Sequence, residues 1–157
     1  MKNVFVFFGL AIGCFGFVAC KDTEPSVQDD TSFTLLQKKS KRGEVPMNLA
    51  GIRVSLIQYE ASFDTFVSCN EYPPRSSDGK NIQDWMVTDS GGFQTLNWQP
   101  DGGVRGSYSV KLTKNESGQN DFIATGVIDV DGDGVYATYT ATTTSKPIIP
   151  TTDKDIY

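Results

Sequence analysis

The chain has 157 residues, a net charge of −5 and no histidine. This length accommodates one domain with a terminal extension. The lack of histidine excludes Ser-His-Asp and Cys-His nucleophiles and His-ligated zinc or haem. The acidic balance argues against nucleic-acid binding, which requires a basic face. The 15 glycines favour a turn-rich, partly β architecture.

The N-terminal residues have the pattern of a bacterial export signal. Lys2 supplies a positive charge, and residues 4–19 are uncharged and largely apolar. This run is shorter than the ~20 residues that span a bilayer as a helix, and it fits the apolar core of a secretory signal. Residues 17–20 read FVAC and resemble a bacterial lipobox, in which the cysteine is lipidated and becomes the mature N-terminus. An ordinary signal cut near Ala19, or an uncleaved anchor, is the alternative.

Cys20 is therefore the predicted lipidation site, and residues 1–19 are the predicted lipoprotein signal peptide. Their removal takes Lys2 with it and changes the net charge from −5 to −6. Acyl chains then hold the protein on a membrane, because each buried CH₂ group contributes about 0.8 kcal/mol. We expect a lipid-anchored protein of the bacterial envelope, with its globular domain in the periplasm or on the cell surface. Lys21 favours the outer membrane. Cys69 lacks a disulfide partner and is expected to be a buried thiol.

Residues 20–42 are expected to form a polar and basic tether behind the lipidated cysteine. Val27 is the single apolar side chain between residues 21 and 32, so this stretch lacks the apolar surface that ordering requires. The basic cluster that follows could lie on anionic lipid head groups or form a solvated helix face, and we favour the helix face. The cluster comprises Lys38, Lys39, Lys41 and Arg42.

A globular domain is predicted over residues 43–157, and it begins with a long helix. Apolar residues recur there at alternating steps of four and three, a period that a helix produces and a strand does not. We expect the helix to begin between Glu44 and Met47, because Pro46 is tolerated only near a helix start, and to end near Ser68. The apolar stripe comprises Val45, Leu49, Ile52, Leu56, Tyr59, Phe63 and Phe66.

Strand patterns follow the helix. Val104–Thr113, Asp121–Ile128 and Val135–Thr143 alternate apolar and polar residues, as expected for strands with one solvated face. Short polar turns between them favour antiparallel neighbours. A short strand is also predicted at Trp85–Val87, and a half-buried extended segment at Phe93–Trp98. Together these elements predict an α+β fold, in which one long N-terminal α-helix packs on a three- to four-stranded antiparallel β-meander.

The turn before the last predicted strand carries three alternating aspartates, Asp129, Asp131 and Asp133, in a D-x-D-x-D-G pattern. Curling of such a loop brings the carboxylates together, and oxygen ligands suit Ca²⁺. The EF-hand form is excluded, because its twelfth position holds Thr140 in place of an acid. A tight Asp-Gly hairpin turn explains the same pattern without an ion, so both interpretations stay open.

The sequence contains no constellation of residues that is typical of catalysis. Its serines and threonines have no histidine to activate them, and it lacks the Gly-Lys motif that cradles phosphates. We therefore predict that the protein is not an enzyme and has no small-molecule substrate and no nucleic-acid partner. Ca²⁺ at the aspartate turn is the one cofactor that the residues suggest.

Three stretches resemble type IV pilins and related bacterial pilin-like proteins. Residues 41–52 (KRGEVPMNLAGI) and residues 58–61 (QYEA) are similar to the exposed half of the long pilin helix. Residues 92–102 (GFQTLNWQPDG) are similar to the F-x-x-L-G-W-x-P-(D/E)-G stretch of the family. The resemblance covers roughly residues 41–143 and implies a helix backed by an antiparallel meander. Pilins, however, begin with a prepilin cleavage site and a long apolar helix, which a lipoprotein-like signal and a polar tether replace here.

Three hypotheses of function follow from these observations. The first is a non-catalytic, lipid-anchored pilin-like envelope protein that acts by protein–protein contacts, associated with a type IV pilus or a type II secretion pseudopilus. The second is a minor pilin or pseudopilin inserted through its N-terminal apolar segment. The third is a calcium-binding surface receptor module built on Asp129, Asp131 and Asp133. The expected partners are the membrane, through the lipid, and proteins of a pilus or secretion system.

Overall fold

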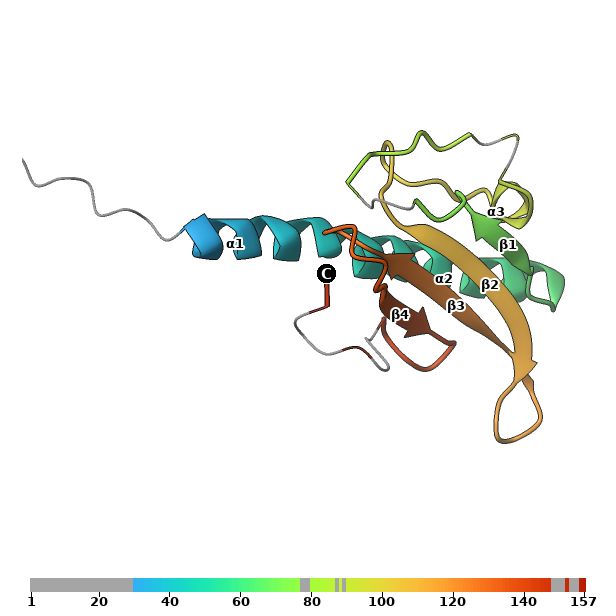
Figure 1. The fold of residues 1–157 in the computed structure, drawn as a ribbon. Helices are drawn as coiled ribbons and strands as arrows, with labels where there is room; N and C mark the ends of the chain where they lie inside the picture. Colours follow the sequence, from blue (N-terminus) through green and yellow to red (C-terminus); the bar gives the residue numbers. More distant parts are fainter. Residues whose placement is uncertain (1–29, 77–79, 87, 89, 148–151, 153–155) are drawn as a thin grey trace, which may run out of the picture.

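The computed structural model describes residues 30–76, 80–86, 88, 90–147, 152 and 156–157. Two helices are followed by a strand, a short helix and three further strands (Figure 1). The predicted α+β class is confirmed, since the N-terminal helix packs against a four-stranded antiparallel meander. The elements are α1 (Asp30–Arg42), α2 (Glu44–Phe63), β1 (Cys69–Tyr72), α3 (Gly92–Thr95), β2 (Ser107–Lys114), β3 (Asn120–Ile128) and β4 (Ala137–Ala141).

Helices α1 and α2 lie end to end and run in the same direction (Figure 1). Gly43 between them keeps right-handed helical angles, and its N–H donates to the Lys39 carbonyl at 3.1 Å. Pro46 has no N–H to offer the Arg42 carbonyl four residues earlier, which explains the interruption of the regular hydrogen bonding. The two helices therefore form one long rod with a local defect.

The rod begins earlier than the sequence predicted. Residues from Asp30 onward are helical, although residues 20–42 were expected to be a tether. Arg42 supplies a physical reason, because its side chain is only 6% exposed and its Nε donates to Tyr139 Oη at 2.6 Å. Its guanidinium also lies over the Tyr157 ring. The predicted solvated basic face is thus wrong for Arg42, which fastens the end of α1 to β4.

The rod also ends earlier than predicted, at Phe63 rather than near Ser68. Asp64 adopts a left-handed conformation with φ of 56°, and its N–H donates to the Glu60 carbonyl at 2.8 Å. A residue in this conformation stops a helix while satisfying one of its last carbonyls.

The four strands lie in the order β1-β2-β3-β4, and every neighbouring pair is antiparallel. Strands β2, β3 and β4 confirm the three predicted strands within a few residues at their ends. Strand β1 was not predicted. It pairs Cys69 with Val110 of β2 and adds an edge to the sheet.

Two predicted elements between α2 and β2 are wrong. Residues 93–98 are not extended, because Gly92–Thr95 form helix α3 and the Leu96 N–H donates to the Gly92 carbonyl at 3.0 Å. This turn places Phe93 entirely inside the core. Trp85 and Met86 belong to no strand, and Val87 lies outside the described residues.

The core lies between α2 and the sheet. The α2 side chains that face the sheet are Val45, Leu49, Ile52 and Leu56, all 0% exposed. Strand β3 approaches the helix closely at Gly126, where an added Cβ would lie 2.5 Å from Val45 Cγ1. Any side chain here would push the helix away from the sheet. Buried side chains from the rest of the chain include Phe66, Cys69, Phe93, Tyr108, Val110, Phe122, Ala124, Ile128 and Tyr139.

Candidate functional site

The aspartate turn between β3 and β4 brings its three predicted residues together. Asp129, Asp131 and Asp133 each place one carboxylate oxygen within 4.8 Å of the others. Asp129 is 1% exposed, and its two oxygens accept the N–H groups of Gly132 at 2.6 Å and Gly134 at 2.9 Å. The buried carboxylate therefore holds the turn in shape, and Gly132 and Gly134 take the positive φ angles of 76° and 86° that the turn interpretation expected of its glycines.

Asp131 links this turn to the N-terminal rod. Its Oδ2 lies 3.1 Å from Lys38 Nζ of α1, and the same ammonium lies 5.5 Å from the centre of the Tyr157 ring. The other oxygen, Oδ1, is buried and has no hydrogen-bond partner in the described part of the chain. The three carboxylates thus form a cluster that could hold a cation, with Lys38 as the competing positive charge. Thr140 pairs with Thr125 inside the sheet and does not extend the loop.

A second carboxylate network joins the start of α2 to the sheet. Glu44 Oε1 accepts the backbone N–H groups of Arg105 at 2.8 Å and Gly106 at 3.2 Å, as well as the Tyr108 hydroxyl at 3.2 Å. The Tyr108 hydroxyl also accepts a hydrogen bond from Asn48 Nδ2 at 2.8 Å. Burial, followed by the charge of Glu44, raises the pKa of Tyr108 above its usual range. Sequence reasoning missed this network, because its members are distant along the chain and no local pattern marks them.

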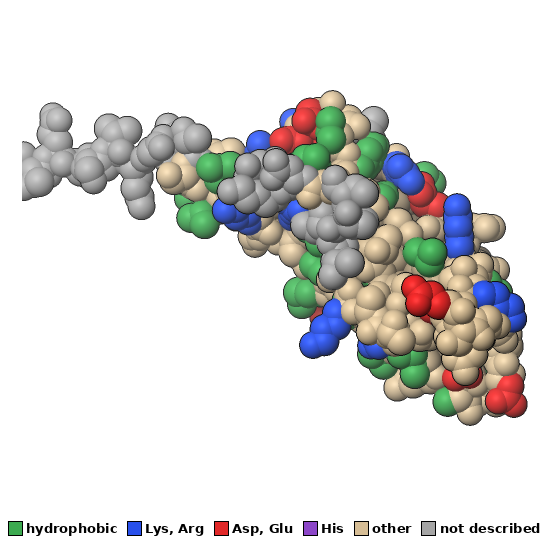
Figure 2. Space-filling model, turned by 90° about the horizontal axis from the view of Figure 1, so that it is seen from below, with side chains coloured by type: hydrophobic (Ala, Val, Ile, Leu, Met, Phe, Trp, Pro, Cys, Tyr) green, Lys and Arg blue, Asp and Glu red, His purple; other side chains and the backbone are tan. Residues whose placement is uncertain are grey.

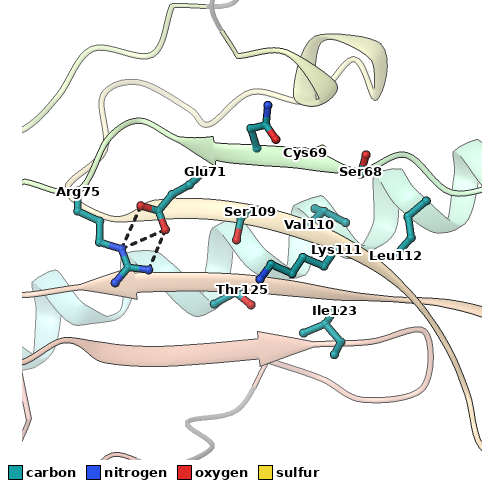
Figure 3. A pocket seen from close by; sticks show the side chains of 11 residues that line it. Ser68, Cys69, Glu71, Arg75, Ser109, Val110, Lys111, Leu112, Ile123 and Thr125 are labelled. Atoms are coloured by element: carbon teal, nitrogen blue, oxygen red, sulfur yellow. Dashed lines mark hydrogen bonds and ion pairs between the residues drawn. The ribbon is translucent and has the colours of Figure 1, made fainter.

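The outer face of the sheet carries an open groove of about 880 Å³ across β1, β2 and β3. Figure 3 shows Glu71 and Arg75 facing each other at one end, where the guanidinium donates three hydrogen bonds to the carboxylate at 2.8–3.0 Å. The hydrogen bonds that the Arg75 guanidinium donates to Glu71 raise the pKa of Arg75 above its ordinary value. Both side chains are exposed, so the pair adds little stability. The groove floor is mainly Ser109, Lys111, Ile123 and Thr125.

Cys69 is a buried free thiol, as predicted. It lies on β1 with 3% of its surface exposed. Burial raises its pKa to about 12, so the thiolate is scarce at neutral pH and the side chain behaves as a small hydrophobe.

The predicted lipidation site, Cys20, lies outside the described residues. The nearest described segment is α1, and Figure 2 shows hydrophobic and basic side chains together on this narrow end of the molecule. Phe33 and Leu36 of α1 are 63% and 65% exposed. None of the helices in the described part of the chain combines the length and hydropathy that a bilayer span requires.

The chain matches no family model, and no curated protein or solved structure matches it significantly. The structure is consistent with the resemblance to pilins at the level of the fold, which is a long N-terminal helix on a four-stranded antiparallel sheet.

Proposed function

We propose that this chain is a non-catalytic, lipid-anchored envelope protein with a pilin-like fold that acts through protein–protein contacts. The observation that carries the proposal is the rod formed by α1 and α2, which continues beyond the sheet toward the predicted anchor (Figure 1). Lys38 and Arg42 fasten α1 to the aspartate turn and β4. A lipid on Cys20 would therefore be attached, through residues 21–29, to a stem that is continuous with the core.

A role beside a type IV pilus or a type II secretion pseudopilus is the finer form of this proposal. It draws on the resemblance of residues 41–52 and 92–102 to pilin-like proteins. The alternative is a minor pilin or pseudopilin, in which residues 4–19 stay attached and insert as a helix.

Metabolic labelling with a palmitate analogue tests the anchor. We expect label on the wild type and on the matched variant Cys14→Ser, and none on Cys20→Ser. Label that persists on Cys20→Ser would reject this anchor site. Sheared filaments that contain the protein with residues 1–19 intact would favour the minor-pilin alternative instead.

A calcium-binding function is a second candidate, favoured by Asp131 Oδ1 of the aspartate cluster, which is buried and has no hydrogen-bond partner among the described residues. Calorimetry of the full chain with CaCl₂ should give binding heat that Asp131→Asn removes. Asp101→Asn, which changes an exposed aspartate in another turn, is the matched control and should bind as the wild type does. Absence of binding heat in the wild type would remove this candidate.

A further inference from the structure

The rod formed by α1 and α2 is apolar on two sides. One side is the core stripe described above. On the other, Phe33, Leu36, Met47 and Val54 are 63%, 65%, 76% and 48% exposed. Large hydrophobic side chains left in solvent along one line of a helix indicate a surface that binds another protein.

These exposed residues belong to a regular repeat, which we call the outer stripe. Its positions alternate in steps of three and four over four heptads and include no charged residue. At 3.6 residues per turn the outer stripe lies about 180° from the core stripe, and it extends for about 42 Å. All of its members are exposed or half-buried, and the half-buried Ile57, at one edge of the stripe, also packs against the core cluster. They are Phe33, Leu36, Ser40, Gly43, Met47, Ala50, Val54, Ile57 and Ala61.

We propose that the outer stripe binds the outer stripe of a second copy of this chain, with the two helices antiparallel. Helices pair along apolar seams with this spacing when the seam lasts three to four heptads. A contact of identical surfaces about a twofold axis closes on itself and yields a dimer. The sheet lies on the opposite side of each helix, so it does not obstruct the approach.

The sizes of the side chains select the antiparallel arrangement. With Met47 opposite Ala50 of the second copy, every facing pair between Leu36 and Ala61 combines a large residue with a small one, and Phe33 lies beyond the paired length. A parallel pair in register would instead set Leu36 against Leu36 and Gly43 against Gly43, leaving alternating crowding and gaps. The remaining antiparallel pairs are Leu36 with Ala61, Ser40 with Ile57 and Gly43 with Val54.

The charges beside the outer stripe agree with the same register. Lys39 and Glu60 both flank the stripe on one side, and in the antiparallel pair Lys39 of one copy lies next to Glu60 of the other. Within the described part of the chain, neither side chain forms an ion pair of its own. Charges of opposite sign beside such a seam determine the relative orientation of the paired helices, and they contribute less to the affinity. The association uses only described residues and does not depend on the lipid anchor or on Ca²⁺.

Cysteine cross-linking in cells that produce two differently tagged full-length chains tests the arrangement. Leu36→Cys in one chain and Ala61→Cys in the other should form a mixed disulfide on mild oxidation, because the antiparallel pair places them opposite each other. Leu36→Cys alone should not cross-link, since its two copies lie about 38 Å apart along the axis. Cross-linking of Leu36→Cys with itself, or no mixed disulfide above the wild-type level, would overturn the proposal.

Sedimentation of the detergent-solubilised full chain gives an independent readout. Val54→Glu should weaken the dimer by at least about tenfold, because it places an unpaired charge in the seam. Ile123→Glu is the matched control, as it makes the same change of charge at a half-exposed aliphatic residue on the outer face of the sheet, and it should dimerise as the wild type does. A monomeric wild type, or equal dimerisation of the two variants, would overturn the proposal.

Discussion

The helix–sheet interface and the aspartate turn each contain a carboxylate that accepts two backbone N–H groups, but over very different distances along the chain. Glu44 accepts from residues 61 and 62 positions away, whereas Asp129 accepts from residues three and five positions away. The first carboxylate joins two layers of the fold, and the second closes one turn. Changes at the interface should therefore affect the whole molecule, and changes at the turn should stay more local.

The largest expected effect concerns the reactivity of Cys69, which is buried in the core cluster. With a pKa of about 12 in place of the ordinary 9.0, native Cys69 should react with a small alkylating reagent at pH 8 about 1000-fold more slowly than in the unfolded chain. Peptide-level mass spectrometry with and without denaturant measures both rates. Equal alkylation rates in the native and unfolded states would contradict the buried position of Cys69.

The raised pKa of Cys69 also predicts how the stability of the fold depends on pH. The contribution of this thiol to the free energy of unfolding is complete below pH 9 and is lost as the pH rises toward 12.

Glu44→Ala should be the most destabilising single change among the polar residues. It leaves two backbone N–H groups and the Tyr108 hydroxyl without their acceptor, and we expect a loss of about 3 kcal/mol in the free energy of unfolding. Urea denaturation followed by circular dichroism measures this loss. Glu44→Gln keeps an oxygen acceptor and should lose less. Equal losses in the two variants would show that packing, rather than hydrogen bonding, makes Glu44 important.

Asp129→Ala should cost about 2 kcal/mol, because it leaves the Gly132 and Gly134 N–H groups unsatisfied in a partly buried turn. The loss should appear first as faster amide exchange in residues 129–136, with slower change in α2. Asp129→Asn retains an acceptor and serves as the control. Exchange that rises equally in α2 would contradict the local character of this turn.

Lys38→Met should have the smallest effect, below about 1 kcal/mol, since the Lys38–Asp131 pair is part-exposed. Amide exchange in α1 should nevertheless increase, because this pair helps Arg42 to hold α1 against the rest of the fold. Lys41→Met removes another lysine of the same helix, one that forms no ion pair within the described part of the chain, and it should leave exchange unchanged. The comparison separates the ion pair from a general effect of charge.

Periodic and local features were predictable from the sequence. The core stripe from Val45 to Leu56 and the alternation in β2 and β3 repeat every two to four residues. Each pattern can therefore be recognised within a short segment, and it predicts a helix or a strand there. The aspartate cluster was predictable for the same reason, because its three residues lie within five positions. Cys20 remains a prediction, since it lies outside the described residues.

Features that depend on distant partners were not predictable. Strand β1 has four residues and no alternation of its own, and only its pairing with β2 makes it a strand. The segment 93–98 alternates like a strand, but burial of Phe93 under the sheet edge favours a helical turn. Likewise, nothing near Arg42 indicates that Tyr139 and Tyr157 will enclose it.

The close fit of Val45 against Gly126 has a mechanical consequence. Because the helix side chain occupies the space where a Cβ of β3 would lie, the rod cannot slide along the sheet without first lifting away from it. A pull along α1 would thus load this contact in shear, together with the Glu44 hydrogen bonds beside it. A molecule held by its N-terminal end would transmit such tension directly into its centre.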